Sequence, residues 1–216
     1  MLTPPRSAGI FVSLLLSLAS RAEAQGASLP SVFVIGDSHV EMVGPMLTAR
    51  LSETGFRALG YEARRGWSTR RYREAGDLRR LLERRGRPEI VVVSLGGNDR
   101  VASRERYAED LAWIVAEARA AGARQLVWLG PASSDASAGP RAAFTGARHE
   151  ENAELQRELL ADLGVRWIDS RPLTQTHHGS DGVHFTRTGY STWTAGVVPA
   201  LESAVAPTTL DAPELG

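Results

Sequence analysis

The sequence predicts a single α/β domain in which a parallel sheet is covered by helices on both faces. Short apolar, β-branched segments alternate along the chain with segments whose apolar residues recur at helical spacing. The chain has 216 residues, which is enough for one substantial core and too few for two domains of ordinary size. No internal repeat and no change of composition marks a linker. One domain is therefore expected.

Five apolar runs predict the strands of this sheet. In chain order they cover residues 31–35, 56–63, 89–95, 125–129 and 165–168. The third run, Glu89–Leu95, is the clearest, because a nearly continuous apolar segment is typical of a strand buried on both faces. Gly36 ends the first run, and Gly130-Pro131 ends the fourth. All five strands are expected to be parallel, since helical segments separate them.

Helical spacing of apolar residues predicts five helices between or after these strands. In chain order they cover about residues 40–55, 77–85, 103–122, 146–163 and 186–204. Ser103 is a suitable N-cap for the third helix, although Arg106 stands where a capping box has Glu or Gln. A segment rich in Ser, Ala and Gly before Gly146 is expected to be a loop.

The N-terminal segment predicts export. Arg6 precedes an apolar run of about 12 residues, and Ala22-Glu23-Ala24 offers the small residues that a signal peptidase requires. We therefore expect residues 1–24 to be a signal peptide cleaved near Ala24, and the protein to be periplasmic or secreted. A retained anchor or a disordered leader is the alternative, although the apolar run is too short to span a bilayer. Residues 205–216 are expected to form a disordered tail.

The overall charge excludes a general attraction to nucleic acid or to anionic membranes. Basic and acidic residues number 25 each, and every basic residue is Arg. Residues 64–87 depart from this balance, with ten Arg against three acidic residues. A solvated helix face and a surface for an anionic glycan are both compatible with that run. The chain has no Cys, so it forms no disulfide.

Four short motifs are expected to meet at one edge of the sheet. In chain order they are Gly36-Asp37-Ser38, Gly66, Gly96-Gly97-Asn98-Asp99 and Asp181-Gly182-Val183-His184. The first three follow predicted strands, and the last precedes the final helix. Ligands of open parallel sheets bind at the carboxyl ends of the strands, where the strand order reverses. In a sheet of order 2-1-3-4-5 the first and third strands are neighbours, which brings Ser38 close to Asn98.

These motifs supply the groups that ester hydrolysis through an acyl-enzyme requires. Ser38 is the candidate nucleophile and His184 the candidate base. Asp181 lies three residues before His184, where a turn lets its carboxylate accept a hydrogen bond from the ring Nδ1–H. Taken alone, Ser38 is more typical of a helix cap, and an Asp-x-x-His pattern is weak. Their joint place at one sheet edge favours catalysis.

Three groups are expected to stabilise the oxyanion of the reaction. The backbone N–H of Ser38 lies at a helix N-terminus, where N–H groups are unpaired and the helix dipole is positive. Gly66 lacks a side chain, so its N–H can approach a substrate, although a lone Gly is also a common turn residue. The side-chain NH₂ of Asn98 is the third expected donor.

The four motifs, in this order and at strand ends, resemble the SGNH hydrolase (GDSL-like lipase/acylhydrolase) family over residues 31–204. The resemblance implies a three-layer, flavodoxin-like fold whose five-stranded parallel sheet has the order 2-1-3-4-5. It implies Ser38 as nucleophile, His184 as base and Asp181 as its partner, with no metal and no other cofactor. The first motif continues with His39 instead of the frequent Leu, which leaves the chemistry intact.

Three further residues are candidates for the rim of the substrate site. His39 directly follows the nucleophile. Trp67 follows Gly66 and could stack on a sugar or an acyl group, and Arg100 could bind an acidic group. Packing within the fold is the alternative for each of them.

A metal site is the alternative for the histidines near the last motif. His177 and His178 could join Asp181 and His184 around an ion. Their spacing matches no standard zinc pattern, and such a site would consume the expected base. No metal site is therefore predicted.

The function expected from the sequence is that of an exported serine esterase. It would remove a short acyl group, such as acetyl, from a carbohydrate or cell-wall polymer. The alternatives are a lysophospholipase or thioesterase of the same family, a transferase that uses the same acyl-enzyme, and a glycan-binding protein without turnover. The expected partner is a small or polymeric ester, with no nucleic acid and no stable membrane insertion. The oligomeric state is left open.

Overall fold

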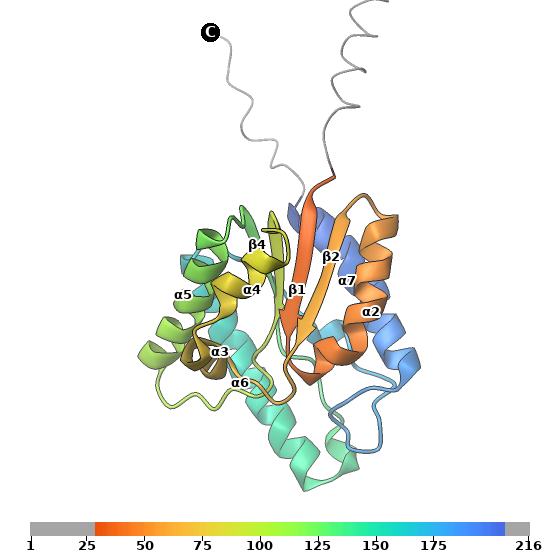
Figure 1. Ribbon diagram of the computed structural model, residues 1–216. Helices are drawn as coiled ribbons and strands as arrows, with labels where there is room; N and C mark the ends of the chain where they lie inside the picture. Colours follow the sequence, from red (N-terminus) through yellow and green to blue (C-terminus); the bar gives the residue numbers. More distant parts are fainter. Residues whose placement is uncertain (1–28, 206–216) are drawn as a thin grey trace, which may run out of the picture.

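The structure is a computed structural model that describes residues 29–205 (Figure 1). The expected signal peptide over residues 1–24 lies outside the described residues. So does the expected tail, apart from Val205, which is the last residue of the final helix.

Five strands form one parallel sheet in the order β2-β1-β3-β4-β5, which confirms the predicted fold class and strand order. The strands are β1 (Ser31–Gly36), β2 (Arg57–Ala63), β3 (Ile90–Ser94), β4 (Gln125–Leu129) and β5 (Arg166–Ile168). β1 and β3 are buried along their whole length, as their continuous apolar sequences require.

The last residues of all five strands are aligned across the sheet. Gly36 pairs with Ala63 on one side and with Ser94 on the other, and the alignment continues through Leu129 to Ile168. The loops after the five strands therefore all leave from one edge. This register places the four motifs of the sequence on a common side of the molecule.

Residues 29–205 contain six α-helices and two short 3₁₀ segments, and the last helix and the second 3₁₀ segment follow the final strand. The helices are α2 (Ser38–Glu53), α3 (Thr69–Ala75), α4 (Leu78–Arg84), α5 (Arg104–Ala120), α6 (Pro140–Asp162) and α7 (Arg187–Val205). The 3₁₀ segments are η1 (Ala136–Ala138) and η2 (Arg171–Leu173). Within residues 29–205, no helix combines the length and the apolar character needed to cross a membrane.

The helices bury two separate cores against the two faces of the sheet (Figure 1). The α2–α7 core contains residues of these two helices, such as Leu47 and Trp193, packed on β1, β3 and β4. The α3–α6 core contains residues of α3, α4, α5 and α6, such as Tyr72 and Leu111, packed on the opposite face. The predicted three-layer arrangement is thus confirmed.

Two parts of the helix prediction are wrong. α3 was not predicted, because its Arg-rich sequence shows no apolar period and buries only Thr69 and Tyr72. α6 begins at Pro140, whereas a loop was expected up to Gly146. Proline at the first helical position is a helix-start signal, and here the surrounding Ser, Ala and Gly residues obscured it.

Candidate active site

Ser38 is the first residue of α2, and Asp37 alone separates it from the carboxyl end of β1. The helix cap is Asp37, whose Oδ1 accepts a hydrogen bond from the His39 N–H at 3.0 Å. The alternative that Ser38 serves only as the cap is therefore wrong. Its hydroxyl is free of that role, and its Oγ lies 3.0 Å from Nε2 of His184.

Asp181 holds the His184 ring from its other side. Its Oδ2 lies 2.7 Å from the ring Nδ1, and its Oδ1 accepts the backbone N–H groups of Val183 and His184 at 3.0 and 2.9 Å. These bonds favour a proton on Nδ1, so that Nε2 can accept the proton of Ser38. The residues predicted as nucleophile, base and partner thus form one chain of hydrogen bonds, although Ser38 and His184 are 146 residues apart.

The carboxyl group of Asp181 is stabilised in its charged form. Partial burial acts to raise its pKa, but hydrogen bonds from the His184 ring and from the Val183 and His184 backbone outweigh burial and lower the pKa. Asp181 is therefore ionised at neutral pH. A fixed negative charge beside Nδ1 stabilises the positive charge that develops on the ring when it accepts a proton.

The side chain of Asn98 is held between the first and second motifs. Its Nδ2 donates to Oδ2 of Asp37 at 2.8 Å and lies 3.3 Å from the backbone oxygen of Trp67. No motif of the sequence predicts this link between Asp37 and Asn98. Burial is the main reason why the pKa of Asp37 is raised to about 6, with the charge of Asp99 acting in the same direction.

The three expected oxyanion donors line two adjacent cavities. Ser38 lines a cavity of about 110 Å³, Gly66 lines a cavity of about 960 Å³, and Asn98 lines both. Gly66 has a positive φ of 66° and an exposed backbone, with no atom within 4 Å of the place where a Cβ would lie. A residue other than Gly would be strained in this conformation.

His39 packs against the ring of His184. Its side chain is 7% exposed, and its ring centroid lies 5.2 Å from that of His184 and 5.7 Å from that of Trp193. Burial, followed by the charge of His184, lowers the pKa of His39 to about 3, so His39 is neutral at physiological pH. It lines the smaller cavity, but most of its surface is in contact with protein.

The other two expected rim residues have different surroundings. Trp67 contacts the Tyr72 ring edge-on at 5.1 Å, and the Arg64 guanidinium lies 4.4 Å from its ring centroid. Among the described residues, Trp67 is not part of the lining of either cavity. Arg100 is exposed and lines the larger cavity.

The histidines considered for a metal site are not brought together. His178 has its Nε2 3.3 Å from the backbone oxygen of Ser133, whereas His184 is held between Ser38 and Asp181. In the part of the chain that the structure describes, no group of three or more His, Cys, Asp or Glu side chains could hold a metal ion.

Helix α6 supplies cavity residues that the sequence analysis missed. The two cavities share four lining residues, which are Asn98, Arg141, Thr145 and Arg148. Arg141 and Thr145 lie where a loop was expected, and Arg148 lies near the start of the expected helix. Their spacing of four and three residues places them on one helical face, which is the signal that could have identified them.

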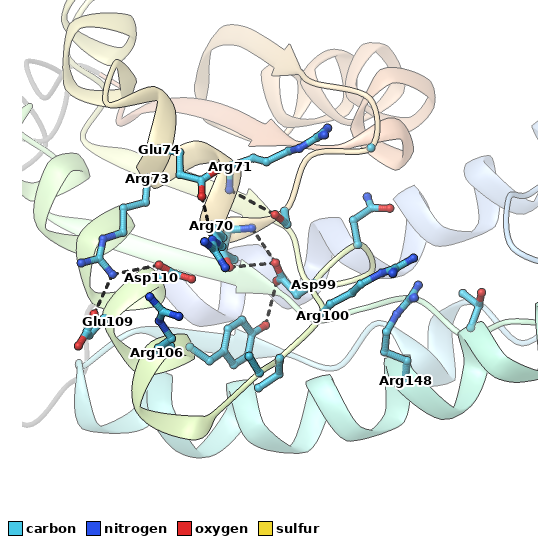
Figure 2. Close-up of a pocket in the computed structure, with 18 of the residues that line it drawn as sticks. Arg70, Arg71, Arg73, Glu74, Asp99, Arg100, Arg106, Glu109, Asp110 and Arg148 are labelled. Carbon is cyan, nitrogen blue, oxygen red and sulfur yellow. Dashed lines mark hydrogen bonds and ion pairs between the residues drawn. The ribbon is translucent and has the colours of Figure 1, made fainter.

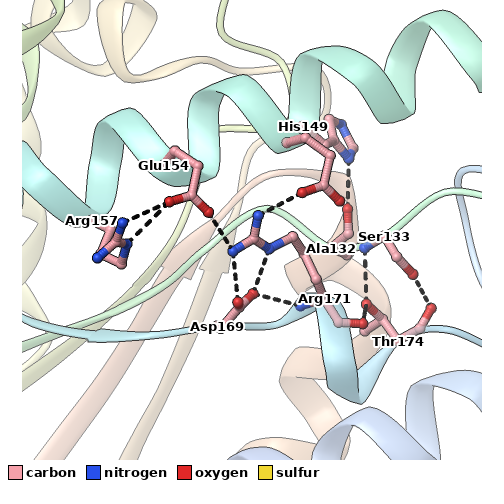
Figure 3. A network of polar contacts seen from close by, with 9 residues as sticks. Ala132, Ser133, His149, Glu154, Arg157, Asp169, Arg171 and Thr174 are labelled. Carbon is pink, nitrogen blue, oxygen red and sulfur yellow. Dashed lines mark hydrogen bonds and ion pairs between the residues drawn. The ribbon is translucent and has the colours of Figure 1, made fainter.

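The position of α6 over the sheet edge is fixed by polar contacts. His149 has Nδ1 2.7 Å from the backbone oxygen of Ala132, after β4, and Nε2 3.2 Å from that of Gly97, after β3. Figure 3 shows the His149–Ala132 contact and, further along the helix, the ion pairs of Arg171 with Glu154 and Asp169. The helix is thereby tied to the loops after β3, β4 and β5.

Comparison with known proteins gives one family and a set of similar folds. The profile of the GDSL-like Lipase/Acylhydrolase family matches residues 34–191. The chain is similar to Est24, a carbohydrate acetylesterase from Sinorhizobium meliloti, with 15% identity, a TM-score of 0.64, and coverage of 81% of this chain and 99% of that one. It is also similar to the aryl esterase of M. smegmatis, with 17% identity, a TM-score of 0.64, and coverage of 82% and 100%.

A third similar structure is TesA, with 22% identity, a TM-score of 0.62, and coverage of 81% of this chain and 99% of that one. At these identities the similarity to solved structures establishes a shared fold. No curated protein matches the chain.

Proposed function

We propose that this chain, which belongs to the GDSL-like lipase/acylhydrolase family and is an ester-hydrolysing enzyme, is an exported serine esterase. Its substrate would be a short acyl ester, such as an acetyl ester, of a carbohydrate or cell-wall polymer. Export is proposed from the N-terminal sequence of residues 1–24.

The proposal of a short acyl group rests on the small size of the cavity at Ser38. Its volume is about 110 Å³, whereas pockets for drug-sized ligands usually span roughly 300–1,000 Å³. A long alkyl chain would have to enter the neighbouring cavity, which is lined by seven arginines and four acidic residues. Placing hydrocarbon against those side chains would remove charges from water at a high cost. The geometry favours a small acyl group.

The larger cavity favours a polar alcohol portion. Its volume of about 960 Å³ and its charged lining suit a hydrophilic group such as a saccharide chain. The similar fold of a carbohydrate acetylesterase is consistent with this choice. No observation favours a lipid substrate over a saccharide.

The proposed reaction has two steps. His184 Nε2 accepts the proton of Ser38 as Oγ attacks the ester carbonyl carbon, and the oxyanion is stabilised by the N–H groups of Ser38 and Gly66 and by the Asn98 amide. His184 then donates the proton to the leaving alcohol. Water, activated in the same way, hydrolyses the acyl-enzyme and restores the free serine.

The Asn98 amide donates both of its hydrogens within the protein, one of them in a long hydrogen bond. Asp37 accepts one of its two hydrogens at 2.8 Å, whereas the contact with the Trp67 oxygen is longer, at 3.3 Å. The oxyanion of the reaction is negatively charged and is therefore a stronger hydrogen-bond acceptor than the backbone carbonyl of Trp67. The second hydrogen of Asn98 is thus expected to turn to the oxyanion.

Substitution of the nucleophile tests the proposal. We expect Ser38→Ala to lower kcat on p-nitrophenyl acetate by at least about 10³-fold, because no acyl-enzyme can form. Ser52→Ala, which changes an exposed serine of the same helix, is the matched control and should retain full activity. A wild type without esterase activity, and indistinguishable from Ser38→Ala, would refute the proposal.

A series of p-nitrophenyl esters tests the acyl length. We expect kcat/KM to be highest for about two to four carbons and to fall with each added methylene, since the cavity at Ser38 cannot enclose more. A maximum beyond about eight carbons would instead support a lysophospholipase or thioesterase, in which case the larger cavity would accept hydrocarbon despite its charges.

A further inference from the structure

Charge is unevenly distributed over the larger cavity (Figure 2). Two of its arginines that do not line the smaller cavity are neutralised by ion pairs. Arg70 lies 2.8 Å from Glu74, and Arg73 lies 3.0 Å from both Glu109 and Asp110. Glu74, Glu109 and Asp110 also line this part of the cavity, together with Arg71 and Arg106, which form no ion pair within residues 29–205.

The part of the cavity next to the active site lacks such counter-charges. Arg141 and Arg148 line both cavities, and Arg100 lines the larger one. In Figure 2 the guanidinium ends of Arg100 and Arg148 lie near each other, and the charge of Arg100 acts on Arg148. Across residues 29–205, none of these three arginines forms an ion pair with a carboxylate. We call Arg100, Arg141 and Arg148 the arginine cluster.

Arg148 is the least solvated member of the cluster. Its Nη2 donates to the backbone oxygen of Gly97 at 2.8 Å, but its Nε is buried and has no hydrogen-bond partner among the described residues. Burial and then the charge of Arg100 lower its pKa. A half-buried cation beside a second cation is unfavourable unless an anion approaches.

The charge of the buried Asp99 acts favourably on Arg148, but Asp99 forms no ion pair with the cluster. Both oxygens of Asp99 are already bonded. Oδ1 accepts the backbone N–H and the hydroxyl of Thr69 at 2.8 and 2.9 Å, and Oδ2 accepts the Tyr107 hydroxyl at 3.1 Å. The positive charge of the cluster therefore faces the cavity.

We infer that the arginine cluster binds an anionic group, a carboxylate or a phosphate, of a saccharide chain whose acyl ester lies at Ser38. The saccharide part of this inference rests on the proposed function. Guanidinium groups bind carboxylate and phosphate oxygens through paired hydrogen bonds. Phe144, which is 68% exposed, lines the same cavity with the Arg148 guanidinium 5.8 Å from its ring centroid, and offers an apolar face for a sugar ring.

A pair of substrates that differ only in charge tests this inference. The substrates are acetylated polygalacturonate with free carboxylates and the same polymer with methyl-esterified carboxylates. The variant is Arg100→Gln/Arg141→Gln, and the matched control is Arg80→Gln/Arg84→Gln, which removes two exposed charges on α4 outside the cavity.

We expect wild type to prefer the charged polymer, and added salt to weaken that preference. In the cluster variant the ratio of kcat/KM for the charged to the esterified polymer should fall about tenfold, mainly through KM. The control should keep the wild-type ratio. Equal kcat/KM for both polymers in wild type, or an unchanged ratio in the cluster variant, would overturn the inference.

A binding measurement separates this inference from the proposed function. Calorimetry of Ser38→Ala with polygalacturonate, dextran phosphate and neutral dextran requires no turnover. Binding to an anionic polymer that is lost on adding Arg100→Gln/Arg141→Gln supports the inference and identifies the anion. Equal affinity for neutral dextran, or no binding to any polymer, refutes it. An enzyme inactive on every ester but able to bind an anionic polymer would refute only the proposed function.

Discussion

Asp37 connects two parts of the site through a single carboxylate. One oxygen caps α2 by accepting the His39 N–H, and the other accepts the Asn98 amide. The start of α2 and the side chain of Asn98, the expected oxyanion donor, are thereby held to the same group. The connection requires a buried carboxylate, and burial penalises its charged form. Function at this residue is therefore expected to conflict with stability.

The pH dependence of stability should reveal this conflict. Burial raises the pKa of Asp37 in the folded chain to about 6, from 3.8. Its contribution to stability is complete below pH 3.8 and is lost as pH rises through about 6, because the folded state then carries a buried charge. Asp37→Asn should reduce the fall in unfolding free energy between about pH 4 and pH 7 by on the order of 2 kcal/mol.

Urea unfolding of wild type and Asp37→Asn at several pH values measures this effect. Asp162→Asn, an exposed position at the end of α6, is the control and should keep the wild-type slope. Part of the slope should persist in Asp37→Asn, since burial also raises the pKa of Asp99 to about 6. Identical slopes for wild type and Asp37→Asn would contradict the prediction.

The elements differ in how well the sequence predicts them. Strands β1, β3 and β4 are largely continuous apolar runs, because they are buried on both faces of the sheet. Such a run can be recognised in the sequence without knowing which elements pack against it. α3 is short and exposes its three arginines, so no apolar period identifies it, and its only sequence signals are the Ser68 cap and the left-handed Gly76 at its end. The start of α6 is equally hard to predict, because its polar residues face a cavity and show no continuous apolar face.

β3 and α2 pack so closely against the end of β1 that a side chain at position 36 would clash with them. A Cβ at Gly36 would lie 2.5 Å from the backbone oxygen of Ser94 and in contact with the side chain of Val40. We expect Gly36→Ala to lower the unfolding free energy by about 1–3 kcal/mol, because β3 and α2 would have to move apart from β1. The same shift would displace Ser38, so kcat on p-nitrophenyl acetate should fall as well.

Urea unfolding and esterase kinetics measure both consequences. Ser52→Ala, at an exposed position of α2, should change the unfolding free energy by no more than about 0.5 kcal/mol. Wild-type stability in Gly36→Ala would show that the strand end can relax without cost and would contradict the packing argument.

At the scale of the whole molecule, topology explains why the proposed catalytic residues could be found from sequence. The strand order places the ends of β1 and β3 side by side, so motifs that are far apart in the chain converge without any knowledge of side-chain positions. Only part of the arginine cluster could be found in this way. Arg100 directly follows the third motif, and it was expected to bind an acidic group. Arg141 and Arg148 join it through α6, which begins earlier in the chain than the sequence predicted.

The two cores lie on opposite faces of one sheet, and this arrangement predicts how their mutations combine. Leu47 belongs to the α2–α7 core and Leu111 to the α3–α6 core, and both are fully buried. Each substitution by Ala should lower the unfolding free energy by about 2–5 kcal/mol. Because the sheet separates the two sites, the effects should add to within about 0.5 kcal/mol in the double variant.

Unfolding should nevertheless be a single transition, since the strands that carry both cores are the same. Urea titrations followed in parallel by circular dichroism and by tryptophan fluorescence should therefore give coincident curves for wild type and for Leu47→Ala, Leu111→Ala and the double variant. Met42→Ala, which truncates a side chain that is 47% exposed on α2, is the control and should cost much less than either core substitution. Separate transitions for the two probes would mean that the two faces unfold independently. A loss of unfolding free energy in the double variant that differs from the sum of the two single losses would mean that the two cores are coupled through the sheet.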